Sequence, residues 1–244
     1  AGDFYAPVAS RVRADPRRTD DAALEILRSL VKPGETWLDI GAGGGRYALA
    51  IALLAGRVIA VEPSPAMVGV LRASMEEHGI TNVDIVPSRW PMKGGPEADV
   101  SLISHVGYDI EEIGPFLDGM EAATHRMCVA VFLDRAPSAA ASPFWEAVHG
   151  ESRVALPALR EFLVLQLARG RLCEVRLSYR DVQTFDSPEA PLEFLRFQTF
   201  VEPGGEKEQR LREALARALV TVDGRYCLDP RPIPLGVVTW RPRN

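Results

Sequence analysis

Features that mark several specialised protein classes are scarce or missing in this 244-residue chain. It has three cysteines, which lie far apart and form no C-x-x-C pair, so their spacing indicates neither a disulfide framework nor a metal site. No window approaches the ~20 apolar residues of a membrane-spanning helix, and residues 1–18 lack the apolar stretch of a secretory signal. We therefore expect a soluble, cytoplasmic protein with no metal and no membrane partner.

A basic surplus is also missing, since the formal net charge is −5. Nucleic-acid-binding proteins usually carry excess positive charge, because neutralising phosphates supplies most of their non-specific affinity. One run near the start is basic, and it contains Arg11, Arg13, Arg17 and Arg18. We interpret this run as a solvated face. The charge balance thus favours a small-molecule partner over a nucleic acid.

The first half of the chain contains five short apolar segments that alternate with helical patterns. Continuous apolar strands of this kind are typical of a parallel sheet covered by helices on both faces. Ser64 and Pro65 predict the start of one helix and Gly79 its end, while Thr19 or Asp20 is expected to cap the first helix. The five predicted strands are 36–40, 57–61, 83–86, 98–103 and 127–133.

The second half is less regular but supplies two further candidate strands. Residues 173–179 alternate like a half-exposed strand, and residues 236–240 form a short apolar one. We predict a single domain over residues 1–244, with an α/β, doubly wound, seven-stranded mixed sheet whose last strand is antiparallel. Helical patterns within residues 138–220 predict a helical insertion on the substrate side of that domain.

A glycine-rich loop follows the first predicted strand, which ends near Asp39. Residues 41–45 read Gly-Ala-Gly-Gly-Gly and precede a helix. Glycines allow positive φ angles and a close approach of the backbone to a ligand, and the free N–H groups of the following helix favour a polar or anionic group. Glu62 ends the second strand, where a carboxylate can accept both hydroxyl protons of a ribose. Together these features predict a nucleoside-binding site.

A nicotinamide dinucleotide is one alternative ligand. Its fingerprint G-x-G-x-x-G uses the third glycine for close packing of helix on strand. Starting from Gly41, that third position is Arg46. The pattern therefore disfavours a NAD-dependent oxidoreductase and leaves it as a rival.

The segment LDIGAGGGR (38–46), with AVEPS (60–64) after it, resembles the first two motifs of the class I S-adenosylmethionine-dependent methyltransferases. The resemblance covers roughly residues 30–133 and implies the Rossmann-like methyltransferase fold, S-adenosylmethionine as cofactor and S-adenosylhomocysteine as product. It implies that Gly41 and Gly43 approach the methionine moiety and that Glu62 holds the ribose. The implied cofactor-binding residues are Asp39, which orients the loop, Gly41, Ala42, Gly43, Glu62, Pro63, Met67, Ser88, Arg89, Trp90, Ser104 and His105.

The chain departs from the family pattern in the loop after the third strand. Ser88, Arg89 and Trp90 offer no carboxylate for the adenine amino group, so a backbone carbonyl is expected to accept from it. His105 is the candidate catalytic residue, as a base that removes a proton from the acceptor; Tyr108 and Asp109 are further candidates.

The acceptor is not identified by the sequence. Residues 104–107 lack the Asn/Asp-Pro-Pro-aromatic segment of enzymes that methylate amino groups of nucleic-acid bases, which favours a small molecule. We expect Phe4, Tyr5 and residues 138–220 to shape its site. A non-catalytic protein that binds S-adenosylmethionine is the other open alternative, because no general base is unmistakable.

Overall fold

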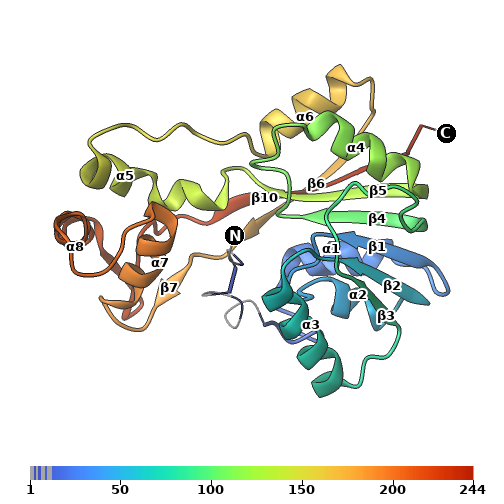
Figure 1. Ribbon diagram of the computed structural model, residues 1–244, viewed down its shortest axis with the longest axis horizontal. Helices are drawn as coiled ribbons and strands as arrows, with labels where there is room; N and C mark the ends of the chain where they lie inside the picture. Colours follow the sequence, from blue (N-terminus) through green and yellow to red (C-terminus); the bar gives the residue numbers. More distant parts are fainter. Residues whose placement is uncertain (1–2, 4, 7–8, 10–12, 244) are drawn as a thin grey trace.

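The computed structural model describes residues 3, 5, 6, 9 and 13–243. Figure 1 shows a main body that contains a sheet and, on the other side, a smaller lobe joined to it by extended segments. The sheet has seven strands in the order β3-β2-β1-β4-β5-β10-β6. These strands are β1 (Thr36–Ile40), β2 (Arg57–Val61), β3 (Val83–Val86), β4 (Ala98–Ser104), β5 (Thr124–Leu133), β6 (Glu174–Arg180) and β10 (Ile233–Trp240).

The strand directions confirm the predicted mixed sheet. Neighbouring strands from β3 to β5 pair in parallel, whereas β10 pairs antiparallel with both β5 and β6. Since β10 runs away from the lobe toward the C-terminus, the carboxyl ends of the parallel strands face the lobe (Figure 1). In open sheets of this kind, ligands bind at that end.

Two helical layers cover the sheet because its strands alternate between two apolar cores. Trp37 points into the core under the first layer and Leu38, the next residue, into the core under the second. Both side chains are fully buried. The first layer comprises α1 (Ala22–Leu30), α2 (Ala48–Ala52) and α3 (Pro65–His78), and the second comprises α4 (Ile113–Ala122) and α6 (Leu159–Ala168).

The predictions for the ends of helices α3 and α1 had different outcomes. The hydroxyl of Ser64 accepts from the backbone N–H of Met67 (3.2 Å), and Gly79 adopts φ 65° after α3, as predicted. For α1 the prediction of Thr19 or Asp20 was wrong. Asp21 is the N-cap, and its Oδ1 accepts from the backbone N–H of Leu24 (3.0 Å). Thr19, Asp20 and Asp21 are all good capping residues, so residue type alone does not choose among them.

The lobe has a small core of its own. Its elements are the 3₁₀ helix η2 (Pro137–Ala141), the helices α5 (Ser142–His149), α7 (Ala190–Thr199) and α8 (Glu206–Ala218), and a three-stranded sheet of β7 (Thr184–Phe185), β8 (Val220–Val222) and β9 (Arg225–Cys227). The predicted insertion over residues 138–220 includes α6 and β6, which the structure places in the body. A helical or alternating pattern shows that a segment has an apolar face but does not show which core covers it.

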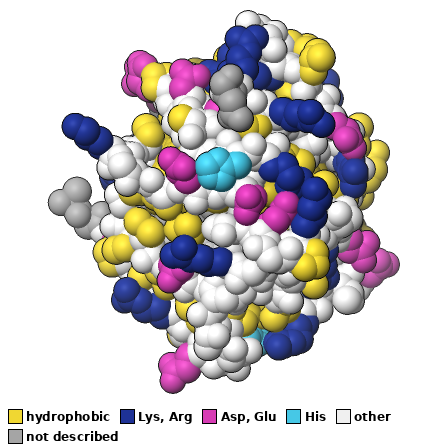
Figure 2. Space-filling view, turned by 90° about the vertical axis from the view of Figure 1, so that its right-hand side faces the viewer, with side chains coloured by type: hydrophobic (Ala, Val, Ile, Leu, Met, Phe, Trp, Pro, Cys, Tyr) yellow, Lys and Arg dark blue, Asp and Glu magenta, His cyan; other side chains and the backbone are white. Residues whose placement is uncertain are grey.

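The end of the body that faces away from the lobe carries side chains of both charge signs, interspersed over the surface (Figure 2). Among them, Arg126 pairs with Glu35 at 2.6 Å where β5 and β1 begin. His125 lies 3.6 Å from Glu97 near the same edge. This end of the body therefore carries intermixed positive and negative side chains and, among the described residues, no extended patch of one charge sign.

Candidate functional site

The glycine loop is held against the ends of two neighbouring strands. The backbone N–H groups of Gly41 and Ala42 both donate to the carbonyl of Val61, at 2.8 and 3.1 Å. Gly41 has φ 77°, and a Cβ atom there would lie 2.6 Å from Cγ2 of Val106, which follows β4. The turn after β1 therefore requires glycine for both its backbone conformation and its packing.

Glu62 fixes the other side of this loop. Its Oε2 accepts from the backbone N–H of Gly43 and its Oε1 from that of Ser64, both at 2.8 Å. The side chain is buried, and burial raises its pKa although these two hydrogen bonds oppose the change. A carboxylate has about four acceptor positions, so Glu62 can bind further hydroxyl groups while it holds the loop.

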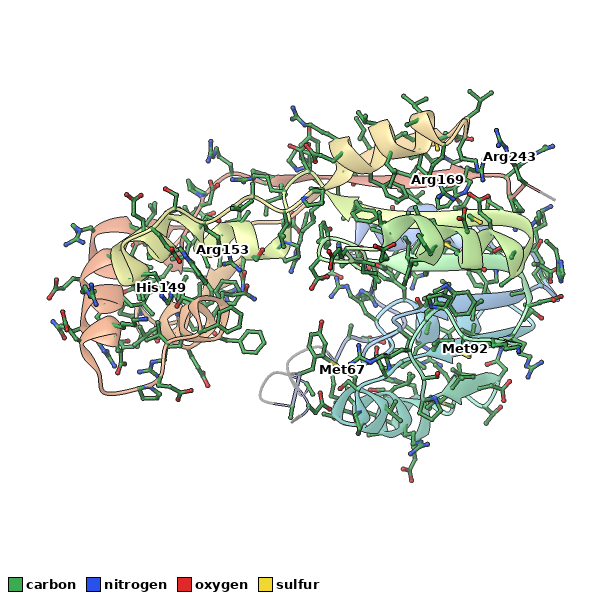
Figure 3. The ribbon with its side chains drawn as sticks, turned by 45° about the horizontal axis from the view of Figure 1, so that its top comes forward. Met67, Met92, His149, Arg153, Arg169 and Arg243 are labelled. Carbon is green, nitrogen blue, oxygen red and sulfur yellow. The ribbon has the colours of Figure 1, made fainter. Side chains whose placement is uncertain are left out.

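A cavity of about 600 Å³ opens beside this loop, at the carboxyl ends of the strands. Its wall is made by the glycine loop, the start of α1, the residues after β4 and the residues that follow β6 toward the lobe. Figure 3 shows Met67 on the side of the body that faces the lobe. The predicted site residues in the wall are Asp39, Gly41, Ala42, Gly43, Met67, Ser104 and His105.

The remaining predicted residues lie outside this wall. Glu62 and Pro63 stand behind the glycine loop at the end of β2. Trp90 packs against α4, where its indole N–H donates to the carbonyl of Phe116 at 3.3 Å. Ser88 donates to the carbonyl of Arg89 at 3.3 Å. The loop after β3 is thus not part of the cavity wall, and its predicted contact with adenine stays a prediction.

Asp3 and Tyr5 also lie at this end of the sheet. The carboxylate of Asp3 accepts from the hydroxyl of Ser64 (2.9 and 2.8 Å) and from the backbone N–H of Ala66 (2.9 Å). Burial, followed by the charges of Asp109 and Glu62, raises the pKa of Tyr5. Tyr5 is therefore close to the end of β2. Phe4, which we also expected to shape the acceptor site, lies outside the described residues, as does Arg11.

Two polar atoms in the cavity wall are buried without a hydrogen-bond partner among the described residues. They are Oδ1 of Asp39 and the hydroxyl of Ser104. Burial, together with the charge of Glu62, raises the pKa of Asp39 to about 7. Since buried polar groups are normally hydrogen-bonded, these two atoms point to a polar ligand.

His105 is held in a strained conformation on the same wall, with φ 56°. Its Nδ1 lies 3.3 Å from the hydroxyl of Tyr108, which also accepts from the backbone N–H of Leu133 at 2.9 Å. Burial, with Arg180 and Arg46, lowers the pKa of His105 to about 4, and burial raises the pKa of Tyr108 to about 12. Both side chains are therefore neutral near pH 7.

Sequence reasoning missed several charged residues of the wall. Arg18, interpreted above as solvated, has a side chain only 10% exposed and pairs with Asp21 at 2.9 Å. Arg46 pairs with the same carboxylate at 2.7 Å. Arg180, at the end of β6, also lines the cavity. Arg18 immediately precedes the predicted capping residues and Arg46 immediately follows the glycine loop, whereas nothing in the local pattern marks Arg180.

Comparisons with known proteins agree with this geometry. Residues 38–111 match the family model described as a methyltransferase domain. The fold is similar to a candidate methyltransferase from Bacillus halodurans, with a TM-score of 0.63 and 17% identity over 92% of this chain and 99% of that one. It is also similar to a coclaurine N-methyltransferase bound to N-methylheliamine and S-adenosylhomocysteine, with a TM-score of 0.54 and 13% identity over 98% and 80% of the two chains. Residues 38–111 therefore match a methyltransferase domain, and the chain as a whole shares its fold with these solved methyltransferases.

One curated relative is a protein assigned as ribosomal RNA small subunit methyltransferase A from Methanosphaera stadtmanae. It is 32% identical over 93 residues, which is 37% of this chain. The match spans only 34% of that protein's length, so it does not carry over the acceptor of the whole enzyme.

The cavity fits S-adenosylmethionine. Its volume of about 600 Å³ is in the usual range for small-molecule sites, about 300–1,000 Å³. The unpartnered oxygens of Asp39 and Ser104 can accept hydrogen bonds from an amino group.

Among the described residues no group of His, Cys, Asp and Glu side chains is arranged to hold a metal ion. Within the same part of the chain, no helix has the length and apolar character needed to cross a membrane.

Proposed function

We propose that this protein transfers a methyl group from S-adenosylmethionine to a small-molecule acceptor. The observation that supports it most is the union of the glycine loop, Glu62 and the cavity at one end of the sheet. The residues proposed to hold the cofactor are Asp39, Gly41, Ala42, Gly43, Glu62, Pro63, Met67, Ser88, Arg89, Trp90, Ser104 and His105. When bound, S-adenosylmethionine supplies a methyl group activated by a sulfonium.

The protein's own contribution is to position the acceptor and to exclude water. Holding two reactants in line can contribute about 7–11 kcal/mol toward the barrier. Ser104 ends β4, His105 follows it, and both line the cavity together with the glycine loop. This position supports a role for both residues in contacting the reacting groups. His105 is our candidate for contact with the acceptor.

Several features support a small acceptor over a nucleic acid. The net charge is −5, and the arginines Arg18 and Arg46 in the cavity wall are already paired with Asp21. The coclaurine N-methyltransferase of similar fold was solved with a small molecule bound. We also propose a reducing, cytoplasmic location, which agrees with free thiols at Cys128, Cys173 and Cys227.

Calorimetric titration with S-adenosylmethionine, S-adenosylhomocysteine and NAD tests the cofactor. We expect micromolar binding of the two sulfur nucleosides and at least about tenfold weaker binding in Glu62→Ala, because hydrogen bonds to a charged group contribute about 1.5–3 kcal/mol. The control is Glu77→Gln, whose carboxylate is exposed on α3 and pairs with Arg13; it should bind as the wild type does. If the folded protein bound neither sulfur nucleoside, the proposal would fail, and tight NAD binding would favour an oxidoreductase.

A non-catalytic binding protein is separated from an enzyme by turnover. Methyl transfer from labelled S-adenosylmethionine to any member of a broad acceptor panel supports the enzyme. Binding of S-adenosylhomocysteine without turnover across the panel favours the non-catalytic alternative.

A further inference from the structure

The wall of the cavity contains one arginine that differs from the others. Arg18 and Arg46 both pair with Asp21, whereas Arg180 has no carboxylate within salt-bridge distance among the residues that the structure describes. Arg180 ends β6, beside Ile233 of β10 and immediately before the segment that leads to the lobe. It lines the same cavity as His105. A cation without a partner at the edge of a binding cavity is a ready contact for an anionic group.

The hydrogen bonds of Tyr108 determine which nitrogen of His105 carries the proton. The Tyr108 oxygen already accepts from the backbone N–H of Leu133, and its own proton needs an acceptor in this buried place. Among the described residues, the hydrogen-bond neighbour that can accept it is Nδ1 of His105, at 3.3 Å. Neutral imidazole carries one proton, so Nε2 of His105 bears it. The ring therefore presents an N–H donor on the side turned away from Tyr108.

This arrangement makes His105 a poor base. A general base accepts a proton with a free lone pair and works best with a pKa near the operating pH. The pKa of His105 is lowered to about 4 by burial and by the positive charges of Arg180 and Arg46, with Asp21 acting in the opposite direction. The part of the cavity beside His105 and Arg180 therefore contains a hydrogen-bond donor and a cation, but His105 does not act there as a base.

Resting on the proposed function, we propose that the acceptor is a small organic oxyanion, either a carboxylate or a phosphonate. Its charged oxygen binds between the guanidinium of Arg180 and Nε2–H of His105, and it is the atom that becomes methylated. In the transfer, the oxyanion donates an electron pair to the methyl carbon as the bond between methyl and sulfur breaks. The electrons of that bond remain on sulfur, which becomes a neutral thioether. No proton has to leave the acceptor, so no base is required.

The two neighbours contribute in different ways. Arg180 selects for negative charge, because a charge-assisted hydrogen bond is roughly twice as strong as a neutral one. Asp20 and Asp181 are exposed acidic residues of the same wall. Their negative charges repel an oxyanion at positions where no arginine lies between them and the anion. The preferred position for an anion is therefore beside Arg180 and His105.

Binding is tested with the full chain saturated with S-adenosylhomocysteine. The probes are benzoate, phenylphosphonate and the neutral benzamide, observed by saturation-transfer NMR. We expect at least one of the two anions to bind at least tenfold more tightly than benzamide. That preference should disappear in Arg180→Gln and persist in the control Arg176→Gln. Arg176 lies on the same strand, but it pairs with Glu174 outside the cavity. Equal affinities, absence of binding, or an unchanged preference in Arg180→Gln would overturn the inference.

Activity provides a second readout with labelled S-adenosylmethionine and matched panels of acids, amides and amines. We expect turnover of the acids but not of the matched amides and amines, because only the acids present an oxyanion to Arg180 and His105. His105→Gln, which keeps an N–H donor, should retain more activity than His105→Ala. Turnover confined to amines or alcohols would overturn the inference and leave the proposed function intact. Failure to bind S-adenosylhomocysteine would instead defeat the proposed function itself.

Discussion

The carboxylate of Glu62 and the backbone N–H of Gly43 lie 2.8 Å apart in a hydrogen bond that joins the end of β2 to the glycine loop. The other oxygen of Glu62 accepts from the N–H of Ser64, the N-cap of α3. One buried side chain thus positions the loop after β1 and the helix after β2. The residue predicted to hold a ribose has a structural task even before a ligand binds.

Replacing Glu62 with alanine should therefore destabilise the fold. The N–H groups of Gly43 and Ser64 would lose their acceptor, and a buried donor without a partner costs about 1–3 kcal/mol. We expect the free energy of unfolding to fall by about 2 kcal/mol or more, measured by urea denaturation. Glu62→Gln keeps one acceptor oxygen and should lose less. Equal stability of Glu62→Ala and the wild type would show that these bonds contribute nothing.

Two glycines of the same loop should respond differently to an added methyl group. Gly41 combines φ 77° with a predicted contact of 2.6 Å between its Cβ and Val106, whereas Gly43 has φ 55° and nothing within 4 Å. Positive φ costs a residue with a Cβ about 1–2 kcal/mol. We expect both alanine variants to be destabilised, and Gly41→Ala more than Gly43→Ala by at least about 1 kcal/mol in urea denaturation.

A second substitution separates the two causes at Gly41. Adding Val106→Ala removes the side chain that the new Cβ would meet, so it should recover part of the stability of Gly41→Ala. It should not improve Gly43→Ala. Equal effects at both glycines would show that backbone conformation alone decides the cost.

The sheet was predictable because its signal is local. The segments around Trp37 and Val129 are continuous apolar runs, and such runs bounded by glycine or proline indicate buried parallel strands. The glycine loop and Glu62 were predictable for the same reason, since the residues that shape them are close in sequence to a strand end. The fold class, the antiparallel direction of the last strand and the cofactor family all followed from such short segments.

The rest of the site depends on contacts between distant segments. Arg180 reaches the cavity only because β6 lies beside β10 at the edge of the sheet, and no periodicity reveals that pairing. Arg18 is buried by its pairing with Asp21 in the cavity wall, although it belongs to a run that reads as solvated. The protonation of His105 depends on Tyr108 and on the backbone of Leu133, from a different strand.

Stability should fall with acid because of His105. Its folded pKa of about 4 lies below the ordinary value of 6.5, so the unfolded chain binds more protons between these values and unfolding becomes easier as pH falls through that window. A shift of one pKa unit corresponds to 1.36 kcal/mol, which gives a total of about 3 kcal/mol for this side chain.

The measurement compares the wild type with His105→Asn and His105→Gln in urea at several pH values between 7 and 4. As the pH falls across that range, the wild type should lose about 3 kcal/mol of its free energy of unfolding relative to each variant. Asparagine also tolerates the positive φ of this position. A constant difference would mean that His105 titrates normally in the folded protein.

Glu121 carries a different kind of charge network at the end of the sheet away from the cavity. Its side chain is 4% exposed, and its oxygens accept from Arg171 at 2.6 and 2.8 Å and from the indole N–H of Trp240 at 3.1 Å. Burial opposes ionisation, but the bonds from Arg171 and Trp240 outweigh it and hold the pKa of Glu121 below its ordinary value. Arg169 and Arg243, labelled in Figure 3, lie in the same region.

Glu121→Gln should therefore destabilise the protein by about 3 kcal/mol, because it leaves the guanidinium of Arg171 buried without a counter-charge. Glu174→Gln is the matched control, since Glu174 pairs with Arg176 at the surface at 3.0 Å and such pairs contribute less than about 1 kcal/mol. Urea denaturation measures both. Calorimetry should show the same affinity for S-adenosylhomocysteine in both variants and the wild type, since the network is remote from the cavity. A weakened affinity in Glu121→Gln alone would mean that the far end of the sheet is coupled to the glycine loop.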